Sequence, residues 1–296
     1  MIRAFAAVAV ISTCLVAWPA SALAGGHGTI KRFGAGAPGL NDLYFPFDGN
    51  GGYDAKHYDL DLAYNPSTDV LRGVATIRAR ATQNLSSFNL DLQGLTVRSI
   101  RVNGRRATWS RAGDELTVTP RRGLRKHTRF TTVVAYDGVP QTNGDAEIGF
   151  SGFIHTDDGT LVIDEPHVAD TWYPVNDHPL DKAAYTFHIK VPDGLVAMSN
   201  GELKSRRSRH GSTTWVWDAK EPMASYLTTA TIGEFDLRAY RKDGIRYWDA
   251  IDPDSSRRSP RARAMGTRSR SRRTPATSGC RARSACRPAG RSSPSG

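Results

Sequence analysis

Side chains that could bind a metal or take part in catalysis are concentrated in residues 165–179, which have the sequence EPHVADTWYPVNDHP. Asp177 and His178 are of the types that bind metals, and Asp181 follows closely. Adjacent side chains point apart on an extended strand, and Pro179 holds the residue before it in an extended conformation. We therefore expect no metal site here. His155, Asp157 and Asp158 form a similar group, which we interpret as a turn ending at a glycine.

The residues of a hydrolytic zinc centre are missing from the sequence. Such a centre needs H-E-x-x-H, in which two histidines one helical turn apart bind zinc and a glutamate acts as general base. None of the eight histidines is followed by glutamate, and no two are spaced four apart. G-x-S-x-G, P-loop and G-x-G-x-x-G motifs are also absent. Cys280 and Cys286 lie near the C-terminus, so a cysteine nucleophile is not expected.

Apolar and polar residues alternate along many short segments, as half-buried strands require. The segments expected to be strands are 57–62, 74–81, 88–92, 95–102, 116–118, 130–136, 185–191, 213–217, 226–232 and 245–251. Together they predict an all-β fold, an antiparallel β-sandwich or saddle. This domain is expected to span residues 53–253.

Between these strands the sequence predicts several local features. Asn103-Gly104 is typical of a tight hairpin turn. Residues 120–127 are rich in arginine and lysine and indicate a solvated hairpin loop, while residues 181–185 could form one helical turn. Trp172 and Tyr173 are expected to be core anchors rather than platforms for a substrate.

The N-terminus has the pattern of an export signal. Arg3 precedes an uncharged apolar run from Ala4 to Trp18, and small residues end at Ala24, so residues 1–24 predict a signal peptide cleaved after Ala24. The run is too short to span a membrane. A secreted, extracytoplasmic product is therefore expected. Residues 25–52 form a glycine-rich leader, which we expect to be pinned to the domain by apolar side chains, namely Leu43, Tyr44, Phe45 and Phe47.

The sequence changes character near residue 254. Residues 255–296 contain twelve arginines, no lysine, no acidic residue and no leucine, isoleucine, valine or aromatic residue. They account for the net charge of +11, because the rest of the chain carries 28 basic and 29 acidic side chains. Such a composition cannot form a core, so residues 254–296 are expected to be a disordered tail. Its main residue types, Arg, Ser, Ala, Pro and Gly, are those encoded by G- and C-rich codons, which favours a frameshift over an evolved anion-binding arm.

Three blocks of sequence resemble the N-terminal domain of zinc aminopeptidases of the aminopeptidase N type. Residues 165–179 are similar to T-Q-x-E/Q-P-x-x-A-R-x-x-F-P-C-x-D-E-P in that family. Residues 191–203 are similar to V-P-x-x-x-x-A-x-S-N-G-x-L, and residues 223–235 to M-S-x-Y-L-x-A-x-x-x-G-x-F. The resemblance covers about residues 53–253.

The resemblance implies a role for one residue. In the family, the acidic or amide side chain before the proline binds the free α-amino group of the peptide, so Glu165 is the candidate substrate-binding residue. A carboxylate suits an ammonium group because the hydrogen bond between them is charge-assisted. Ile163 and Asp170 stand where the family has glutamine and arginine, and these departures weaken the match at the pocket.

The resemblance also implies zinc, peptide substrates and a catalytic domain in full-length relatives. Here H-E-x-x-H and the G-x-M-E-N loop are absent, so we expect a truncated, inactive protein that binds no cofactor and whose packing partner would be the missing catalytic domain. The sequence leaves two alternatives, a secreted β-sandwich binding module and a nucleic-acid or anionic-surface binder that uses the arginine tail.

Overall fold

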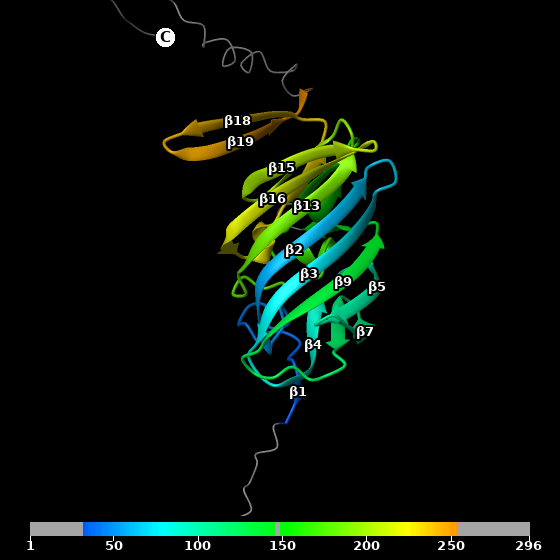
Figure 1. Cartoon of the computed structure of the whole chain (residues 1–296), viewed down its shortest axis with the longest axis vertical. Coiled ribbons are helices and arrows are strands. Elements are labelled where there is room, and N and C mark those ends of the chain that lie inside the picture. The colour runs from blue at the N-terminus through cyan, green and yellow to red at the C-terminus, as the bar shows by residue number, and fades with distance from the viewer. Residues whose placement is uncertain (1–31, 146–148, 254–296) are drawn as a thin grey trace, which may run out of the picture.

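The computed structural model describes residues 32–145 and 149–253 and places most of them in β-strands (Figure 1). The expected signal peptide, its cleavage after Ala24 and the expected tail at residues 254–296 lie outside the described residues. Within them, no helix is long and apolar enough to cross a membrane.

The largest element is an eight-stranded sheet with one buried and one open face (Figure 1). Its strands, in spatial order, are β15 (Glu202–Arg209), β16 (Ser212–Met223), β13 (Ala183–Pro192), β2 (Tyr53–Asn65), β3 (Val70–Ala81), β9 (Arg129–Gly138), β5 (Thr96–Val102) and β6 (Arg105–Arg106). Side chains alternate between the two faces. Leu60, Ile77 and Val134 are buried on the inner face, because a period of two sends every second residue inward.

Two smaller sheets complete the core. One contains β1 (Gly34–Ala35), β4 (Leu85–Asp91), β8 (Glu115–Thr119) and β7 (Thr108–Ala112). The other contains β10 (Thr142–Asp145), β11 (Gly149–His155), β12 (Thr160–Ile163), β17 (Ala230–Gly233) and β14 (Val196–Ser199). Their buried side chains, such as Phe88 and Phe153, belong to one continuous cluster with the inner face of the large sheet.

A two-stranded hairpin projects from the top of this body (Figure 1). It consists of β18 (Asp236–Lys242) and β19 (Ile245–Ile251). Trp248 of the hairpin contacts Trp217 with ring centroids 5.5 Å apart. Two short 3-10 helices, η1 (Ala169–Thr171) and η2 (Ser225–Leu227), interrupt the strands.

The all-β prediction is confirmed, and nine of the ten expected strand segments fall on observed strands. The turn at Asn103-Gly104 is also confirmed. Both residues have positive φ, 49° and 76°, as a hairpin turn of this type requires. The turn between β11 and β12 ends at Gly159, where the Thr156 N–H donates to the Gly159 carbonyl over 3.1 Å.

Three local predictions are wrong. Residues 226–232 are not one strand, because η2 occupies their first part and β17 begins at Ala230. Residues 181–185 form no helical turn, since β13 begins at Ala183 and pairs with β2. Residues 120–127 are not a hairpin loop: they connect β8 and β9, which lie in different sheets, and Leu124 is buried against Leu85.

The pairing is not wholly antiparallel. β13 pairs with β2 in parallel, from Ala184 opposite His57 to Lys190 opposite Ala63, and β1 pairs with β4 in parallel. Parallel strands need a long connection. The chain between β2 and β13 provides it, and contributes three strands to each of the smaller sheets and four to the large sheet.

The leader is attached by its backbone rather than by apolar side chains. Leu43, Tyr44 and Phe47 are exposed by more than 80%, so the prediction that they pin the leader is wrong. Phe45 is also exposed and only contacts His167, with ring centroids 4.9 Å apart. The Gly36 N–H donates instead to the Ser87 carbonyl, and the Gly51 N–H to the Ala37 carbonyl, each over 2.9 Å.

Candidate functional site

The segment between β12 and β13, residues 164–182, contains the first of the three sequence blocks. Its aromatic pair is fully buried, so the expectation that Trp172 and Tyr173 are core residues is confirmed. Their rings lie 4.6 Å apart, and Tyr173 also meets Tyr58 and Tyr185 edge-on. Edge-to-face contacts of this kind add stability beyond the burial of area. The segment is therefore anchored in the centre of the core.

Asp164 fixes the start of this segment. Its carboxyl accepts hydrogen bonds from Trp172 Nε1, at 3.0 and 3.1 Å, and from Thr228 Oγ1 at 2.7 Å. Burial raises the pKa of Asp164 well above its ordinary value. Because Thr228 follows η2, this carboxyl connects the first sequence block to the third.

Asp177 makes a second connection between the same two blocks. Its Oδ1 accepts a hydrogen bond from Ser225 Oγ at 2.5 Å, and its Oδ2 accepts one from the Ala169 N–H at 3.0 Å. The first contact is with η2, and the second closes a loop within residues 169–177. The two blocks lie about 50 residues apart in the sequence and meet where Asp177 contacts Ser225 and Asp164 contacts Thr228. We call this region the buried junction.

Asn176 and Asp181 join the junction to the leader and to the large sheet. Asn176 Oδ1 accepts from the Asn50 N–H at 2.5 Å, and the Asn176 N–H donates to the hydroxyl of Tyr58 at 3.0 Å. Asp181 accepts two hydrogen bonds from the Ala55 N–H, at 3.0 and 3.2 Å, and one from Asn176 Nδ2. These side chains satisfy backbone groups that burial would otherwise leave without partners.

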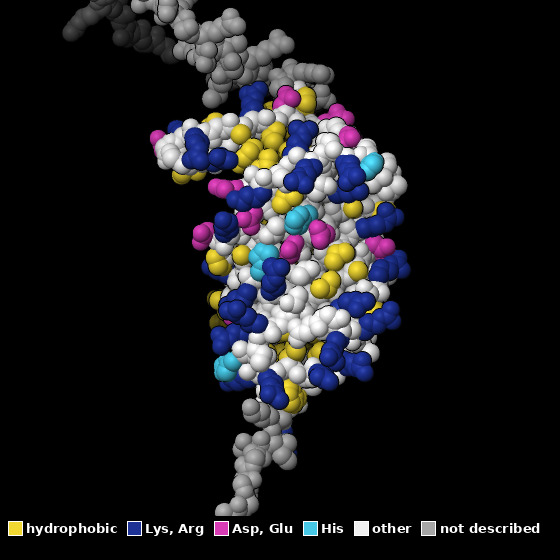
Figure 2. All heavy atoms as spheres, viewed as in Figure 1, with side chains coloured by type: hydrophobic (Ala, Val, Ile, Leu, Met, Phe, Trp, Pro, Cys, Tyr) yellow, Lys and Arg dark blue, Asp and Glu magenta, His cyan; other side chains and the backbone are white. Residues whose placement is uncertain are grey.

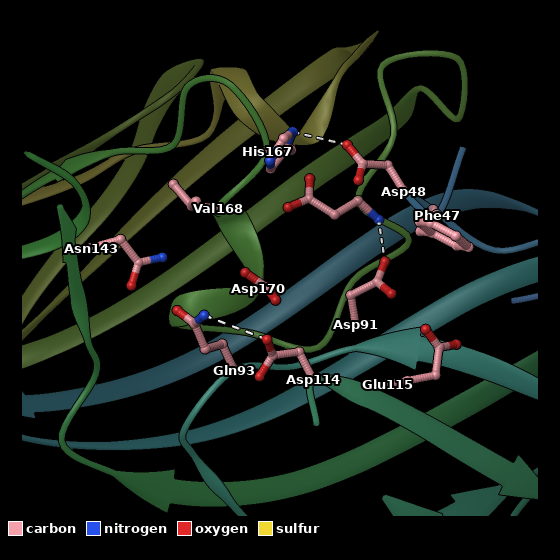
Figure 3. A pocket seen from close by; sticks show the side chains of 12 residues that line it. Phe47, Asp48, Asp91, Gln93, Asp114, Glu115, Asn143, His167, Val168 and Asp170 are labelled. Carbon is pink, nitrogen blue, oxygen red and sulfur yellow. Dashed lines mark hydrogen bonds and ion pairs between the residues drawn. The ribbon is translucent and has the colours of Figure 1, made fainter. Parts of the chain in front are cut away.

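An acidic pocket of about 360 Å³ adjoins this junction (Figure 3). Six carboxylic side chains line it, those of Asp48, Asp91, Asp114, Glu115, Asp170 and Asp177. His167 is the single basic side chain in the lining, and its Nδ1 lies 2.8 Å from Asp48 Oδ2. Asp91 accepts from Asn50 Nδ2 and from the Asp177 N–H, each at 2.8 Å.

Burial raises the pKa of several of these carboxyls. Desolvation raises the pKa of Asp91 to about 8 and that of Asp170 to about 9, and nearby carboxylates act in the same direction. The pKa of Asp177 rises to about 6, because burial outweighs the hydrogen bond from Ser225. The inner wall of the pocket is therefore less negative than its composition indicates.

The histidines and aspartates of the first block do not converge on a common point. Asp177 bonds to Ser225, Asp181 bonds to Ala55, and His178 Nδ1 accepts a hydrogen bond from the Leu180 N–H at 3.1 Å. Among residues 32–145 and 149–253, no group of three or more metal-binding side chains could hold an ion. The residues described here thus offer zinc no ligand set.

Glu165 lies beside this junction but outside the acidic pocket. Its side chain is exposed and makes no hydrogen bond or ion pair with any described residue. Its backbone position is defined by the buried neighbour Asp164. The structure therefore presents the Glu165 carboxylate to solvent from a firmly held segment.

Sequence reasoning missed most of the junction. Asn50, Asp91 and Asp164 were not singled out, because a polar residue next to a strand is usually solvated. Asp170 was noted only as a departure from the family pattern. One sequence signal could have indicated burial, since Asp164 and Asp177 flank the Trp172-Tyr173 pair in a segment without lysine or arginine.

Comparison with known proteins agrees with this geometry. The family model described as Peptidase M1 N-terminal domain matches residues 54–227. Leucyl aminopeptidase from Saccharolobus solfataricus is 23% identical over 183 residues, which cover 61% of this chain and 22% of that protein. The crystal structure of the M1 zinc metallopeptidase from Deinococcus radiodurans is 29% identical, with a TM-score of 0.65, over 69% of this chain and 47% of that one.

A mutant of the Deinococcus enzyme bound to a Tyr-Ser-Ala substrate aligns similarly, with 27% identity and a TM-score of 0.66. The match covers 72% of this chain and 50% of that one. The all-β fold and these matches thus define the class of the protein, which is the N-terminal domain of a peptidase. The chain belongs to the family of peptidase M1 N-terminal domains. It spans at most about half the length of these relatives, which are zinc metallopeptidases and an aminopeptidase.

Proposed function

We propose that this chain acts as the non-catalytic N-terminal part of an exported zinc aminopeptidase. Zinc and the H-E-x-x-H helix would belong to a catalytic domain that the 296 residues do not encode. The pattern of residues 1–24 supports export. By itself, this part would be inactive, because its residues contain no H-E-x-x-H motif.

One observation carries the proposal. The buried junction fixes residues 164–181 by hydrogen bonds and leaves the Glu165 carboxylate exposed, without a partner among the described residues. A carboxylate held in this way can accept a charge-assisted hydrogen bond from a peptide α-ammonium group at the border with a second domain. We propose this role for Glu165 in the complete enzyme.

A domain graft tests this role. Residues 53–233 would replace the matching domain of the Deinococcus enzyme, and the chimera is expected to release N-terminal residues from peptides. In the chimera, Glu165→Ala should lower kcat/KM by at least about tenfold, because a hydrogen bond between charged groups contributes about 1.5–3 kcal/mol. The control is Glu221→Ala, which removes an exposed carboxylate on β16. Equal kcat/KM values for the two variants would contradict the role of Glu165.

The proposal also predicts how the isolated chain behaves in solution. Leu180 and Leu227, next to the junction, are 77% and 47% exposed, and Ile245 on the hairpin is 59% exposed. Exposed apolar side chains near one another promote association. We expect the chain to self-associate as its concentration rises, and we expect Leu180→Ser combined with Leu227→Ser to reduce this.

Sedimentation velocity over a range of concentrations measures the effect. Val74 and Val139 are also exposed but lie away from the junction, so a double change of these two residues to serine is the matched control. If the control reduced association as much as the junction variant, the exposed leucines would not be the contact. A wild-type chain that stays monomeric throughout would contradict the prediction itself.

A further inference from the structure

A second concave site lies on the open face of the large sheet, at the end opposite the projecting hairpin. It is a cleft of about 610 Å³ between β2, β3 and β9, next to the turn that ends at His127. The lining residues are mostly basic and comprise Lys56, His57, Arg78, Ala79, Arg80, His127, Arg129, Phe130 and Thr131. No carboxylate is among them. The cleft therefore concentrates positive charge in a part of the chain that is otherwise close to neutral.

Two arginines face each other across this cleft. Arg80 on β3 and Arg129 on β9 are directly opposite in the strand register. Like charges at such positions destabilise a sheet, so their pairing has an energetic cost in the free protein. Arg80 Nε donates to the His127 carbonyl at 3.3 Å, and the side chain of Arg129 makes no hydrogen bond or ion pair with any residue that the structure describes.

The nearby acidic residues do not neutralise this pair. Asp54 is opposite Arg80 on the other side of β3, but its carboxylate lies 2.5 Å from Lys56 Nζ. Asp59 lies 3.9 Å from Arg78, whose Nη1 also contacts His57 Nδ1 at 2.9 Å. The guanidinium groups of Arg80 and Arg129 thus remain without a carboxylate partner among the described residues.

The adjoining connection between β8 and β9 extends the positive field. Residues 121–129 contain five arginines and lysines, and no acidic residue lies between Glu115 and Asp137. Figure 2 shows that Lys and Arg side chains predominate on the lower part of this face, whereas Asp and Glu side chains lie higher. A surface with charge of one sign in a concave site attracts counter-ions and raises their local concentration.

We propose that this cleft binds a phosphoryl group, held between Arg80 and Arg129. The planar guanidinium group bonds to phosphate oxygens in a two-pronged manner, and a phosphate monoester carries nearly two negative charges. One such group balances both arginines, whereas a carboxylate balances only one. The site is independent of the peptidase role, since it lies on another face and uses neither Glu165 nor zinc.

Arginine footprinting on the full chain tests the site with inorganic pyrophosphate as the probe. The rate of phenylglyoxal modification is measured for each proteolytic peptide, so that the arginines of residues 255–296 are measured separately from Arg80 and Arg129. Pyrophosphate is expected to slow the modification of Arg80 and Arg129. Arg72 and Arg207, on the same sheet at the opposite ends of their strands, serve as internal references and should react at unchanged rates. Equal protection of all four would overturn the proposal.

Matched double variants supply a second measurement. R80Q/R129Q should raise the dissociation constant of pyrophosphate at the protected site by at least about tenfold. R72Q/R207Q removes the same charge and should leave it unchanged. An equal effect of both variants would mean that only the overall charge matters, and would contradict a defined site.

Phospholipid vesicles distinguish the source of the phosphoryl group. If vesicles containing phosphatidate bind the chain and R80Q/R129Q abolishes this, as well as pyrophosphate binding, the group belongs to a lipid. If pyrophosphate binds and the vesicles do not, the ligand is a soluble phosphate ester. Vesicle binding without pyrophosphate binding would indicate diffuse adsorption and would overturn the proposal, as would the absence of both.

Discussion

Replacing Trp172 with alanine is expected to unfold a large fraction of the domain at room temperature. The side chain is fully buried, and a change from tryptophan to alanine in a core costs about 3–5 kcal/mol. It would also deprive the buried Asp164 carboxyl of the indole N–H, which adds about 1–3 kcal/mol. The sum is comparable to the whole stability of many domains, about 5–15 kcal/mol. Urea unfolding followed by circular dichroism measures the loss.

Two further variants separate burial from surface effects. Trp172→Phe keeps most of the ring but loses the hydrogen bond, so it should cost about 1–3 kcal/mol. Trp109 on β7 is 40% exposed, and Trp109→Ala should cost less than about 1 kcal/mol. A Trp172→Ala protein as stable as the Trp109→Ala protein would show that the junction is not central to the fold.

Replacing Asp170 with asparagine is expected to stabilise the protein at alkaline pH. The pKa of this carboxyl is about 9 in the folded protein and near 3.8 when it is solvated, so the folded state holds a proton that the unfolded chain releases. The stability linked to this proton is fully present below about pH 4 and is lost as the pH rises toward 9. Asparagine needs no proton. We expect Asp170→Asn to raise the free energy of unfolding by about 2 kcal/mol at pH 8 and to change it little at pH 4. The value at pH 8 is smaller than the full pKa shift implies, because the carboxyl keeps some contact with solvent.

Urea unfolding at pH 4, 6 and 8 checks this dependence. Asp114 is an exposed carboxylate at the rim of the same pocket, so Asp114→Asn removes the same charge without relieving burial. This control should change stability by less than about 0.5 kcal/mol at each pH. Equal stability of wild type and Asp170→Asn at pH 8 would show that the Asp170 carboxyl is not held protonated by the fold.

The strands and much of the core could be predicted because burial imposes a period of two on the sequence. Trp172 and Tyr173 were assigned to the core by size and apolarity alone, and both are buried. The same reasoning failed for Leu43, Tyr44 and Phe47, which are large but exposed. A leader without periodicity gives no indication of which side chains face the domain. It is attached by backbone hydrogen bonds and by the polar side chains of Asp48 and Asn50, which no apolar pattern reveals.

Long-range pairing and buried polar contacts could not be predicted in the same way. The parallel register of β2 and β13 joins residues more than 120 positions apart, and no local pattern encodes it. The contacts of Asp177 with Ser225 and of Asp164 with Thr228 also join distant segments. The family resemblance placed Asp177 and Ser225 in separate blocks, and only the structure shows that the blocks meet.

The central proposal is that this chain, which belongs to the family of peptidase M1 N-terminal domains, supplies the non-catalytic part of a zinc aminopeptidase. The most direct test is to measure zinc content and peptide hydrolysis on the same sample of purified residues 25–296. After dialysis, we expect no stoichiometric zinc by mass spectrometry and no release of amino acids from aminoacyl reporter substrates or short peptides. One equivalent of zinc, together with turnover that a chelator abolishes, would contradict the account.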